Sequence, residues 1–168
     1  MQGFGITLTP LAEEDFPLFQ ELYSHPDVMR HIAYPLTTSS AKEFFSSVLS
    51  EASKSNPAFT YWSITKDNDT KVGLIGLIFG SKGEPEIGIM MRRYVRSPKL
   101  ADKAMSFVLE HAFSELQKDS VVANIKDSNL AAINLGKRLG FQFDQPIASH
   151  PPAGKWIINK ESFTSALH

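Results

Sequence analysis

The stretch that decides the fold is Glu86-Ile87-Gly88-Ile89-Met90-Met91, together with the segment that follows it as far as Leu116. The six residues are apolar after Glu86 and rich in strand formers, so we predict a β-strand over 86–91. Beyond a basic connection, apolar residues recur at spacings of three and four. They are Ala101, Ala104, Met105, Val108, Leu109, Ala112, Phe113 and Leu116. This stripe predicts an amphipathic helix directly after the strand.

The connection between strand and helix is positively charged. Residues 92–103, which include the first helical residues, hold the cations Arg92, Arg93, Arg96, Lys99 and Lys103 against Asp102 alone. Ser97 and Pro98 are typical of an N-cap and a first helical residue. A helix that begins there would aim free N–H groups and a positive dipole end outward, which suits a phosphate. The same residues also suit a helix start that binds nothing, and both readings stay open.

Composition limits the classes of protein to consider. The chain has 168 residues, with 42% hydrophobic and 21% charged residues, as is ordinary for one globular domain. Its net charge of −1 argues against a general nucleic-acid binder. It has no cysteine, no signal peptide and no apolar run long enough to span a membrane, so we expect a cytoplasmic protein without disulfides. No residues show the spacing of metal ligands, so we expect no metal.

The remaining elements follow from periodicity and turn residues. Ser40 and Glu43 predict a capping box at the start of one helix. Gly140 predicts a left-handed end for another helix, and Pro146 predicts an irregular loop. The predicted strands are 6–9, 59–64, 72–79, 86–91, 120–125 and 156–158. The predicted helices are 16–23 with Asp15 as N-cap, 40–52, 98–116, 130–139 and 161–167, and residues 24–29 are predicted as a turn into one further helical turn. This order predicts one α+β domain over residues 1–168, with a mixed, mostly antiparallel sheet flanked by helices.

These elements, in this order, resemble the GNAT N-acetyltransferase superfamily, and more narrowly its branch of ribosomal-protein N-terminal acetyltransferases. The matching segments are Leu8-Thr9-Pro10-Leu11 with Glu13-Glu14-Asp15, His25-Pro26-Asp27-Val28-Met29-Arg30, Glu86-Ile87-Gly88, Asn129-Leu130-Ala131-Ala132-Ile133 and Lys137-Arg138-Leu139-Gly140-Phe141. The resemblance covers essentially the whole chain. It implies acetyl-CoA as the cofactor and a small-molecule amine or a protein N-terminus as the acceptor. From the net charge and the lack of a long apolar run, we expect no nucleic-acid or membrane partner. Whether the chain forms a homodimer stays open.

The resemblance also implies which residues contact the cofactor. The backbone of the strand at Ile89, Met90 and Met91 would hydrogen-bond the pantetheine arm. The loop that wraps the pyrophosphate falls on Arg96, Ser97, Lys99, Leu100 and Ala101. Here the sequence departs from the family pattern, since Lys99 replaces its central glycine and Ser97 replaces a second glycine common in the branch. Glycine lets backbone approach a phosphate closely and Pro98 removes an N–H donor, so the added cations would have to compensate.

Further site residues come from the same resemblance. Asn129 and Ala132 match cofactor contacts, although Asn129 is equally suited to be an N-cap. Some relatives place a tyrosine, as general acid, where this chain has Gly136. Glu86 is the best-placed carboxylate to act as a base, and its alternative is a charged residue at a strand entrance. His31 and Tyr34 would border the acceptor channel, while a lone histidine is more often structural.

Three functions are therefore compatible with the sequence. The first, which we favour, is N-acetyl transfer from acetyl-CoA to a primary amine by direct attack. The second is a catalytically impaired GNAT scaffold that serves as a CoA-binding or regulatory module, a reading that the lost loop glycine and the missing tyrosine favour. The third is a protein that binds another phosphate ligand at the basic loop.

Overall fold

The computed structural model describes residues 1–168 except 4, 67–68, 81–82, 96 and 164–168. The chain divides into two compact units. The first comprises residues 1–78 and 88–96, and the second comprises residues 79–87 and 97–168. Strand β5 (Glu86–Met91) begins in the second unit and continues in the first.

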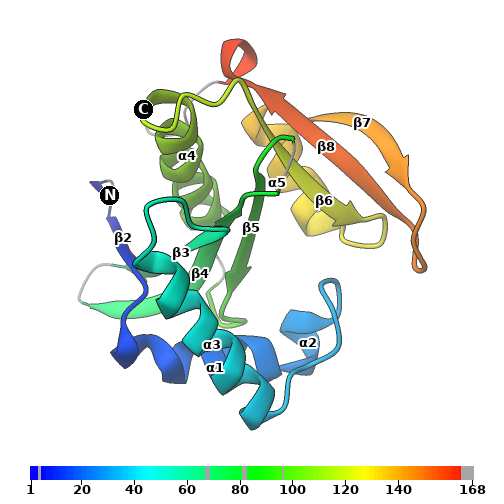
Figure 1. Ribbon diagram of the computed structural model, residues 1–168. Coiled ribbons are helices and arrows are strands. Elements are labelled where there is room, and N and C mark those ends of the chain that lie inside the picture. Colours follow the sequence, from blue (N-terminus) through cyan, green and yellow to red (C-terminus); the bar gives the residue numbers. More distant parts are fainter. Residues whose placement is uncertain (4, 67–68, 81–82, 96, 164–168) are drawn as a thin grey trace. The chain divides into compact units, whose positions relative to one another are not determined.

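The first unit holds five neighbouring strands in the order β1-β2-β3-β4-β5. The strands that precede β5 are β1 (Gln2–Gly3), β2 (Ile6–Pro10), β3 (Phe59–Lys66) and β4 (Thr70–Ile78). The pairs β1–β2, β2–β3 and β3–β4 are antiparallel. The helices of this unit are the 3₁₀ turn η1 (Glu13–Asp15), α1 (Phe16–Ser24), α2 (Pro26–Met29) and α3 (Thr38–Ala52). Helices α1 and α3 lie side by side (Figure 1).

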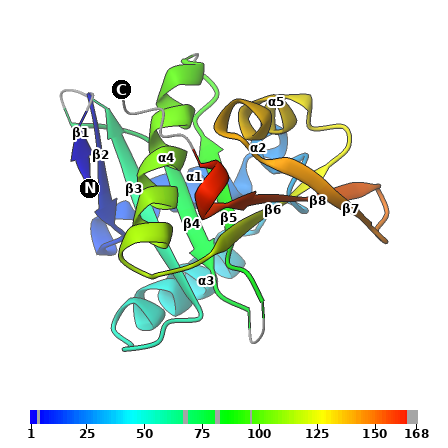
Figure 2. The ribbon, with the colours of Figure 1, turned by 90° about the horizontal axis from the view of Figure 1, so that it is seen from above.

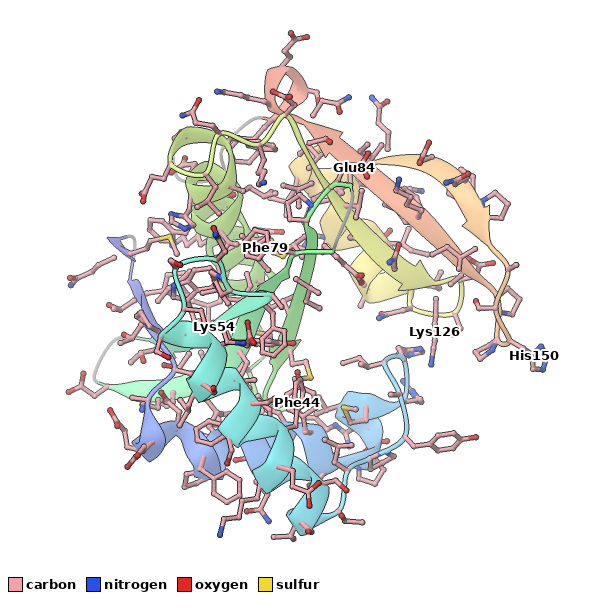
Figure 3. The ribbon with its side chains drawn as sticks, viewed as in Figure 1. Phe44, Lys54, Phe79, Glu84, Lys126 and His150 are labelled. Atoms are coloured by element: carbon pink, nitrogen blue, oxygen red, sulfur yellow. The ribbon has the colours of Figure 1, made fainter. Side chains whose placement is uncertain are left out.

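An aromatic cluster forms much of the core of the first unit. The Phe19 and Tyr23 rings of α1 stack with centroids 4.3 Å apart. Phe44, labelled in Figure 3, projects from α3 and meets Tyr23 and the β3 residue Tyr61 edge to face. The core continues through Met90 of β5, which is buried among these helices and β4. Burial of large aromatic side chains from α1, α3 and β3 therefore fixes how these elements pack.

The second unit contains the start of β5 and the strands β6 (Ser120–Lys126), β7 (Gln142–Ile147) and β8 (Ala153–Asn159), in the order β5-β6-β8-β7. Strand β5 pairs with β6 in parallel at Glu86 and Val122, whereas β6–β8 and β7–β8 are antiparallel. Its helices are α4 (Pro98–Ser114), α5 (Leu130–Leu139) and the 3₁₀ turn η2 (Lys160–Ser162). Figure 2 shows α5 beside the strands β6 and β8.

Helix α5 covers one face of this part of the sheet. The ammonium group of Lys137 lies 5.8 Å from the centre of the Trp156 ring on β8. Gly136 faces Ile125 of β6, and a Cβ atom built there would lie 3.9 Å from it. Gly140 ends the helix with φ of +96° in the left-handed region, as the sequence predicts. None of the helices that the structure describes has the length and apolar character needed to cross a membrane.

The fold class is confirmed as α+β with a mixed, mostly antiparallel sheet, while some predicted details are wrong. Helix α3 starts at Thr38, and Thr37 Oγ1 is the cap that accepts the Ser40 N–H at 3.2 Å, so Ser40 and Glu43 form no capping box. Pro146 lies in strand β7 rather than in a loop. Strand β2 includes Pro10. Of the predicted terminal helix, the described part is the turn η2, and residues 164–168 lie outside the described residues.

Candidate functional site

The part of strand β5 that lies in the first unit has one buried and two half-buried side chains, and some of its backbone groups face away from β4. Met90 points into the core and is buried, while Ile89 and Met91 are half-buried. The Arg92 N–H donates to the Val72 carbonyl of β4 at 2.8 Å. Because backbone polar groups alternate in direction along a strand, the N–H and C=O groups of Ile89 and Met91 face the opposite edge from β4.

Gly88 leaves open space on the same strand. It is exposed, and a Cβ atom built on it would meet no atom within 4 Å. Gly73 on β4 is different, because its Cβ would lie 2.4 Å from the Met90 carbonyl oxygen. Gly73 therefore serves close packing of β4 against β5, and Gly88 leaves room beside the strand.

Glu86 begins β5 in the second unit and contacts Asn124 of β6. The Asn124 side-chain amide donates to Glu86 Oε2 at 2.9 Å. Glu86 is half-buried and Asn124 is exposed. Burial raises the pKa of the Glu86 carboxyl above its ordinary value, and the hydrogen bonds from Asn124 act in the opposite direction. A carboxyl of this kind, poised nearer to neutral pH, is suited to accept a proton.

The start of helix α4 has the predicted form. Ser97 is the N-cap but makes no side-chain capping hydrogen bond, and Pro98 opens the helix. Lys99 is exposed, Leu100 is buried, and Ala101 is half-buried. The predicted contact Arg96 lies outside the described residues. The first turn of α4 thus presents a cation and a positive dipole end without a capping side chain of its own.

Asp102 forms an ion pair within the second unit. Arg138 of α5 holds it with Nη2–Oδ1 at 2.8 Å and Nε–Oδ1 at 3.1 Å. This pairing ties α4 to α5. It also means that the one acidic residue of the basic segment is neutralised by α5 rather than by Lys99.

Asn129 caps helix α5. Its Oδ1 accepts the Ala132 N–H at 3.2 Å, so the N-cap reading is confirmed. The cap uses the side-chain oxygen, and the Nδ2 group of an asparagine amide is a chemically separate donor. Ala132 is half-buried beside this cap.

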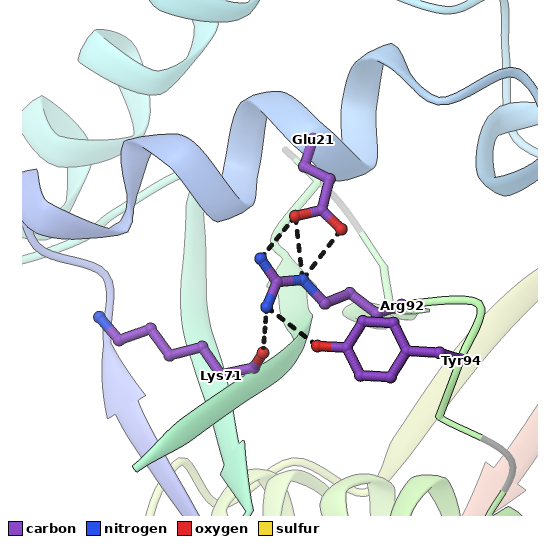
Figure 4. A network of polar contacts seen from close by, with 4 residues as sticks. All are labelled: Glu21, Lys71, Arg92 and Tyr94. Carbon is purple, nitrogen blue, oxygen red and sulfur yellow. Dashed lines mark hydrogen bonds and ion pairs between the residues drawn. The ribbon is translucent and has the colours of Figure 1, made fainter.

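Two of the arginines expected to serve a phosphate have protein partners in the first unit. Arg92 pairs with Glu21 of α1 and also donates to the Lys71 carbonyl at 2.7 Å and to the Tyr94 hydroxyl at 3.1 Å (Figure 4). Arg93 pairs with Asp27 of α2. These arginines therefore stabilise the protein itself, and they add less positive charge to the loop than the sequence predicts.

The predicted acceptor-channel residues lie in the first unit, in the turn after α2. Tyr34 is 91% exposed. His31 is half-buried and is engaged in an interaction within the protein. Among the described residues, no cluster of His, Asp or Glu has the arrangement of a metal site.

Sequence reasoning missed the partner of Glu86 and the neighbouring charges. Asn124 is a polar residue inside the otherwise apolar run of β6, and this was the available signal. The Lys155 ammonium on β8 lies 3.5 Å from Glu84 and 3.4 Å from Asp144 of β7. The local sequence does not predict these ion pairs, because the residues are brought together only by the order of the strands in the sheet.

Comparisons with known proteins agree with this architecture. A family model described as an acetyltransferase (GNAT) domain matches residues 6–142. An uncharacterized N-acetyltransferase, p20, from Bacillus licheniformis is 23% identical over 162 residues, which is 95% of this chain and 91% of that protein.

Solved structures share the fold at low sequence identity. The spermidine N-acetyltransferase of Vibrio cholerae, in complex with CoA and spermine, superposes with a TM-score of 0.81 at 15% identity, covering 94% of this chain and 97% of that chain. An aminoglycoside acetyltransferase in complex with coenzyme A gives a TM-score of 0.77 at 15% identity, covering 94% of this chain and 96% of that chain. The GNAT family model matches more than half of this chain. The chain therefore belongs to the GNAT family of acetyltransferases, whose acetyl donor is acetyl-CoA.

Proposed function

We propose that this protein transfers the acetyl group of acetyl-CoA to a primary amine of a small molecule by direct attack, with Glu86 as the base. The observation that carries the proposal is the Glu86 carboxyl, half-buried at the start of β5 with its pKa raised by burial and with one oxygen held by Asn124. An acceptor amine is protonated at neutral pH and must lose a proton before it can attack. A carboxylate with a raised pKa is suited to take that proton.

The residues that are present fit the cofactor. Open space beside Gly88 and outward-facing backbone groups at Ile89 and Met91 suit an extended arm lying along β5. The first turn of α4, with the exposed Lys99, suits a pyrophosphate. The Asn129 Nδ2 group is a further donor. Acetyl-CoA, when bound, supplies the thioester carbonyl that the amine attacks.

The reaction then balances as follows. Glu86 takes one proton from the ammonium form of the acceptor, directly or through water. The neutral nitrogen bonds to the acetyl carbon while the carbon–sulfur bond breaks, and the proton that the nitrogen then loses protonates the leaving sulfur. The products are the N-acetyl amine and CoA, and Glu86 returns its proton to solvent. No covalent acetyl-enzyme is needed, which fits a chain without cysteine.

The acceptor is proposed as a small amine because two structural relatives are named for spermidine and aminoglycosides. A protein N-terminus, as in the ribosomal-protein branch that the sequence resembles, is the competing acceptor. The test is a panel of spermidine, an aminoglycoside and a short peptide with a free α-amine. Release of CoA can be followed with a thiol reagent, and the protein contributes no background because it contains no cysteine.

Glu86→Gln is the decisive variant for the base. Turnover should fall by about 10²-fold or more, while CoA affinity measured by calorimetry changes by less than about twofold. Glu84→Gln is the matched control, because it removes a carboxylate two residues earlier on the chain that pairs with Lys155. Unchanged turnover in Glu86→Gln would return Glu86 to a structural role, and acetylation of the peptide alone would change the acceptor to a protein N-terminus.

A further inference from the structure

One face of the sheet in the second unit carries a row of polar side chains from three strands. Glu86 is in register with Val122 of β6, and Asn124 lies two residues further along β6, on the same face as Val122. Asn124 is in turn the cross-strand partner of Lys155 on β8. Helix α5 covers the other face, where Ile125 and Trp156 lie.

We propose that Asn124 is a positioning residue for Glu86, which holds Oε2 of the carboxylate so that Oε1 is presented to the acceptor amine. The inference rests on the proposed role of Glu86 as the base. Its geometric basis is the 2.9 Å hydrogen bond between the Asn124 amide and Oε2, made between two neighbouring strands of the second unit.

The contact restricts a side chain that would otherwise rotate. The terminal torsion of a glutamate is broad, so a free carboxylate spends little time in any one orientation. A donor fixed on β6 selects one orientation and leaves the second oxygen as an acceptor. Because Asn124 is exposed and Glu86 is half-buried, the contact lies where a soluble amine can approach the carboxylate from the Asn124 side.

The charges around this contact explain why a neutral donor is suited to it. Lys155 is within 3.5 Å of both Glu84 and Asp144, so its charge is already compensated. An amide favours the ionised carboxylate by hydrogen bonding without adding a full positive charge, which would lower its proton affinity too far for a base. The titratable groups on or beside this face are Glu84, Lys126, Asp144 and Lys155; Glu84 and Lys126 are labelled in Figure 3.

The experiment compares Asn124→Leu and Asn124→Asp with the wild-type chain. Asn124→Leu removes the donor, and Asn124→Asp replaces it with a like charge in a side chain of almost the same size. The titration of the Glu86 carboxyl is followed by NMR with ¹³C-labelled glutamate and assigned with Glu86→Gln. It should move to higher pH by about half to one unit in Asn124→Leu and further in Asn124→Asp.

The reaction should report the same order. With spermidine as the acceptor, the acid limb of kcat/KM should move to higher pH in the order wild type, Asn124→Leu, Asn124→Asp, while the Kd of CoA stays within about twofold. Asn134→Leu, an Asn→Leu change at an exposed position of α5, is the control and should move neither the titration nor the limb. A merely structural role of Asn124 would change stability without this ordered shift.

The outcomes separate the two ideas. A Glu86 titration that is unmoved in both Asn124 variants overturns the inference, whatever Glu86 does, and this arm needs no acceptor. A titration that moves while the acid limb stays fixed and Glu86→Gln stays active overturns the role of Glu86 as the base, and with it the catalytic part of the inference. Asn124→Asp keeps the experiment decisive if the apolar variant folds poorly.

Discussion

Arg92 and Glu21 form a bidentate ion pair between the end of β5 and helix α1. The Arg92 Nε lies 2.9 Å from Glu21 Oε1 and 3.0 Å from Oε2, and the same guanidinium donates to the Lys71 carbonyl of β4. The two residues are 71 positions apart in the chain. One side chain therefore ties three elements of the first unit together at the point where the basic connection begins.

Arg92→Ala should lower the free energy of unfolding by about 1–3 kcal/mol, because it removes a bidentate pair and leaves a carbonyl without its donor. Arg93→Ala is the matched control, since its pair with Asp27 is 62% and 48% exposed at the two side chains. It should cost at most about 1 kcal/mol. Urea denaturation of both variants measures their free energies of unfolding. Equal losses of stability in the two variants would contradict the proposal that Arg92 connects these elements.

Gly73→Ala should destabilise the protein by about 2–4 kcal/mol. The added Cβ would lie 2.4 Å from the Met90 carbonyl oxygen and 2.7 Å from the Met91 sulfur, and the carbonyl belongs to backbone that cannot move cheaply. Gly88→Ala places the same methyl group in open space on the adjoining strand and should change stability by about 0.5 kcal/mol or less. Thermal unfolding compares them; a tolerated Gly73→Ala would show that β4 and β5 can separate at this point.

Glu86→Gln should be at least as stable as wild type at neutral pH. Burial raises the pKa of Glu86 in the folded state, so the contribution of this group to stability is fully present below its unfolded-state pKa and is lost as pH rises through the folded-state value. Glutamine resembles the protonated form and avoids that loss. The advantage should vanish below about pH 4, where both states of the wild-type group are protonated. Denaturation as a function of pH measures the difference in unfolding free energy between Glu86→Gln and wild type. A difference that favours the variant less at pH 7 than at pH 4 would refute the prediction.

Lys99→Glu should leave stability unchanged or slightly higher while weakening CoA binding. A carboxylate is favoured over a cation at a helix start by about 0.3–1 kcal/mol, and Lys99 is exposed in the first turn of α4. Next to a pyrophosphate the same charge is repulsive, so CoA affinity should fall at least about tenfold, or roughly 1.4 kcal/mol, and more at low salt. Calorimetry at two ionic strengths measures this, with Lys42→Glu on the exposed side of α3 as a control of equal charge change. Affinity that survives the change at low salt would place the phosphates elsewhere.

Local sequence was sufficient to locate most elements of this protein. Apolar periodicity and capping residues predicted helix α5 at residues 130–139, and Gly140 as its left-handed end was confirmed. Strand β5 was predicted with its correct bounds, because a run of six residues rich in strand formers is too short for a typical helix. These features depend on residues within a few positions of one another, so sequence alone determined them.

Strand β7 was missed for a physical reason. It lies at the end of the strand order and is exposed along most of its length, so it shows no alternation of buried and exposed residues, and Pro146 argues against a strand. An edge strand can hold a proline where no hydrogen-bonding partner is needed on the outer side. Strand β7 forms because it pairs with β8, and this pairing is decided by the tertiary structure.

The candidate site divides in the same way. The resemblance predicted Glu86 and Lys99 as site residues, and the sequence around Asn129 predicted a cap, which the structure confirms. The cap partner of Asn129 is local, since Ala132 is three residues away. Only the tertiary structure decided the partners of Glu86 and Arg92, because Asn124 reaches Glu86 across 38 positions of sequence and Glu21 reaches Arg92 across 71. The charges counted along the chain predicted that the arginines bind a phosphate. In the fold, Arg92 and Arg93 instead form ion pairs with carboxylates of helices α1 and α2.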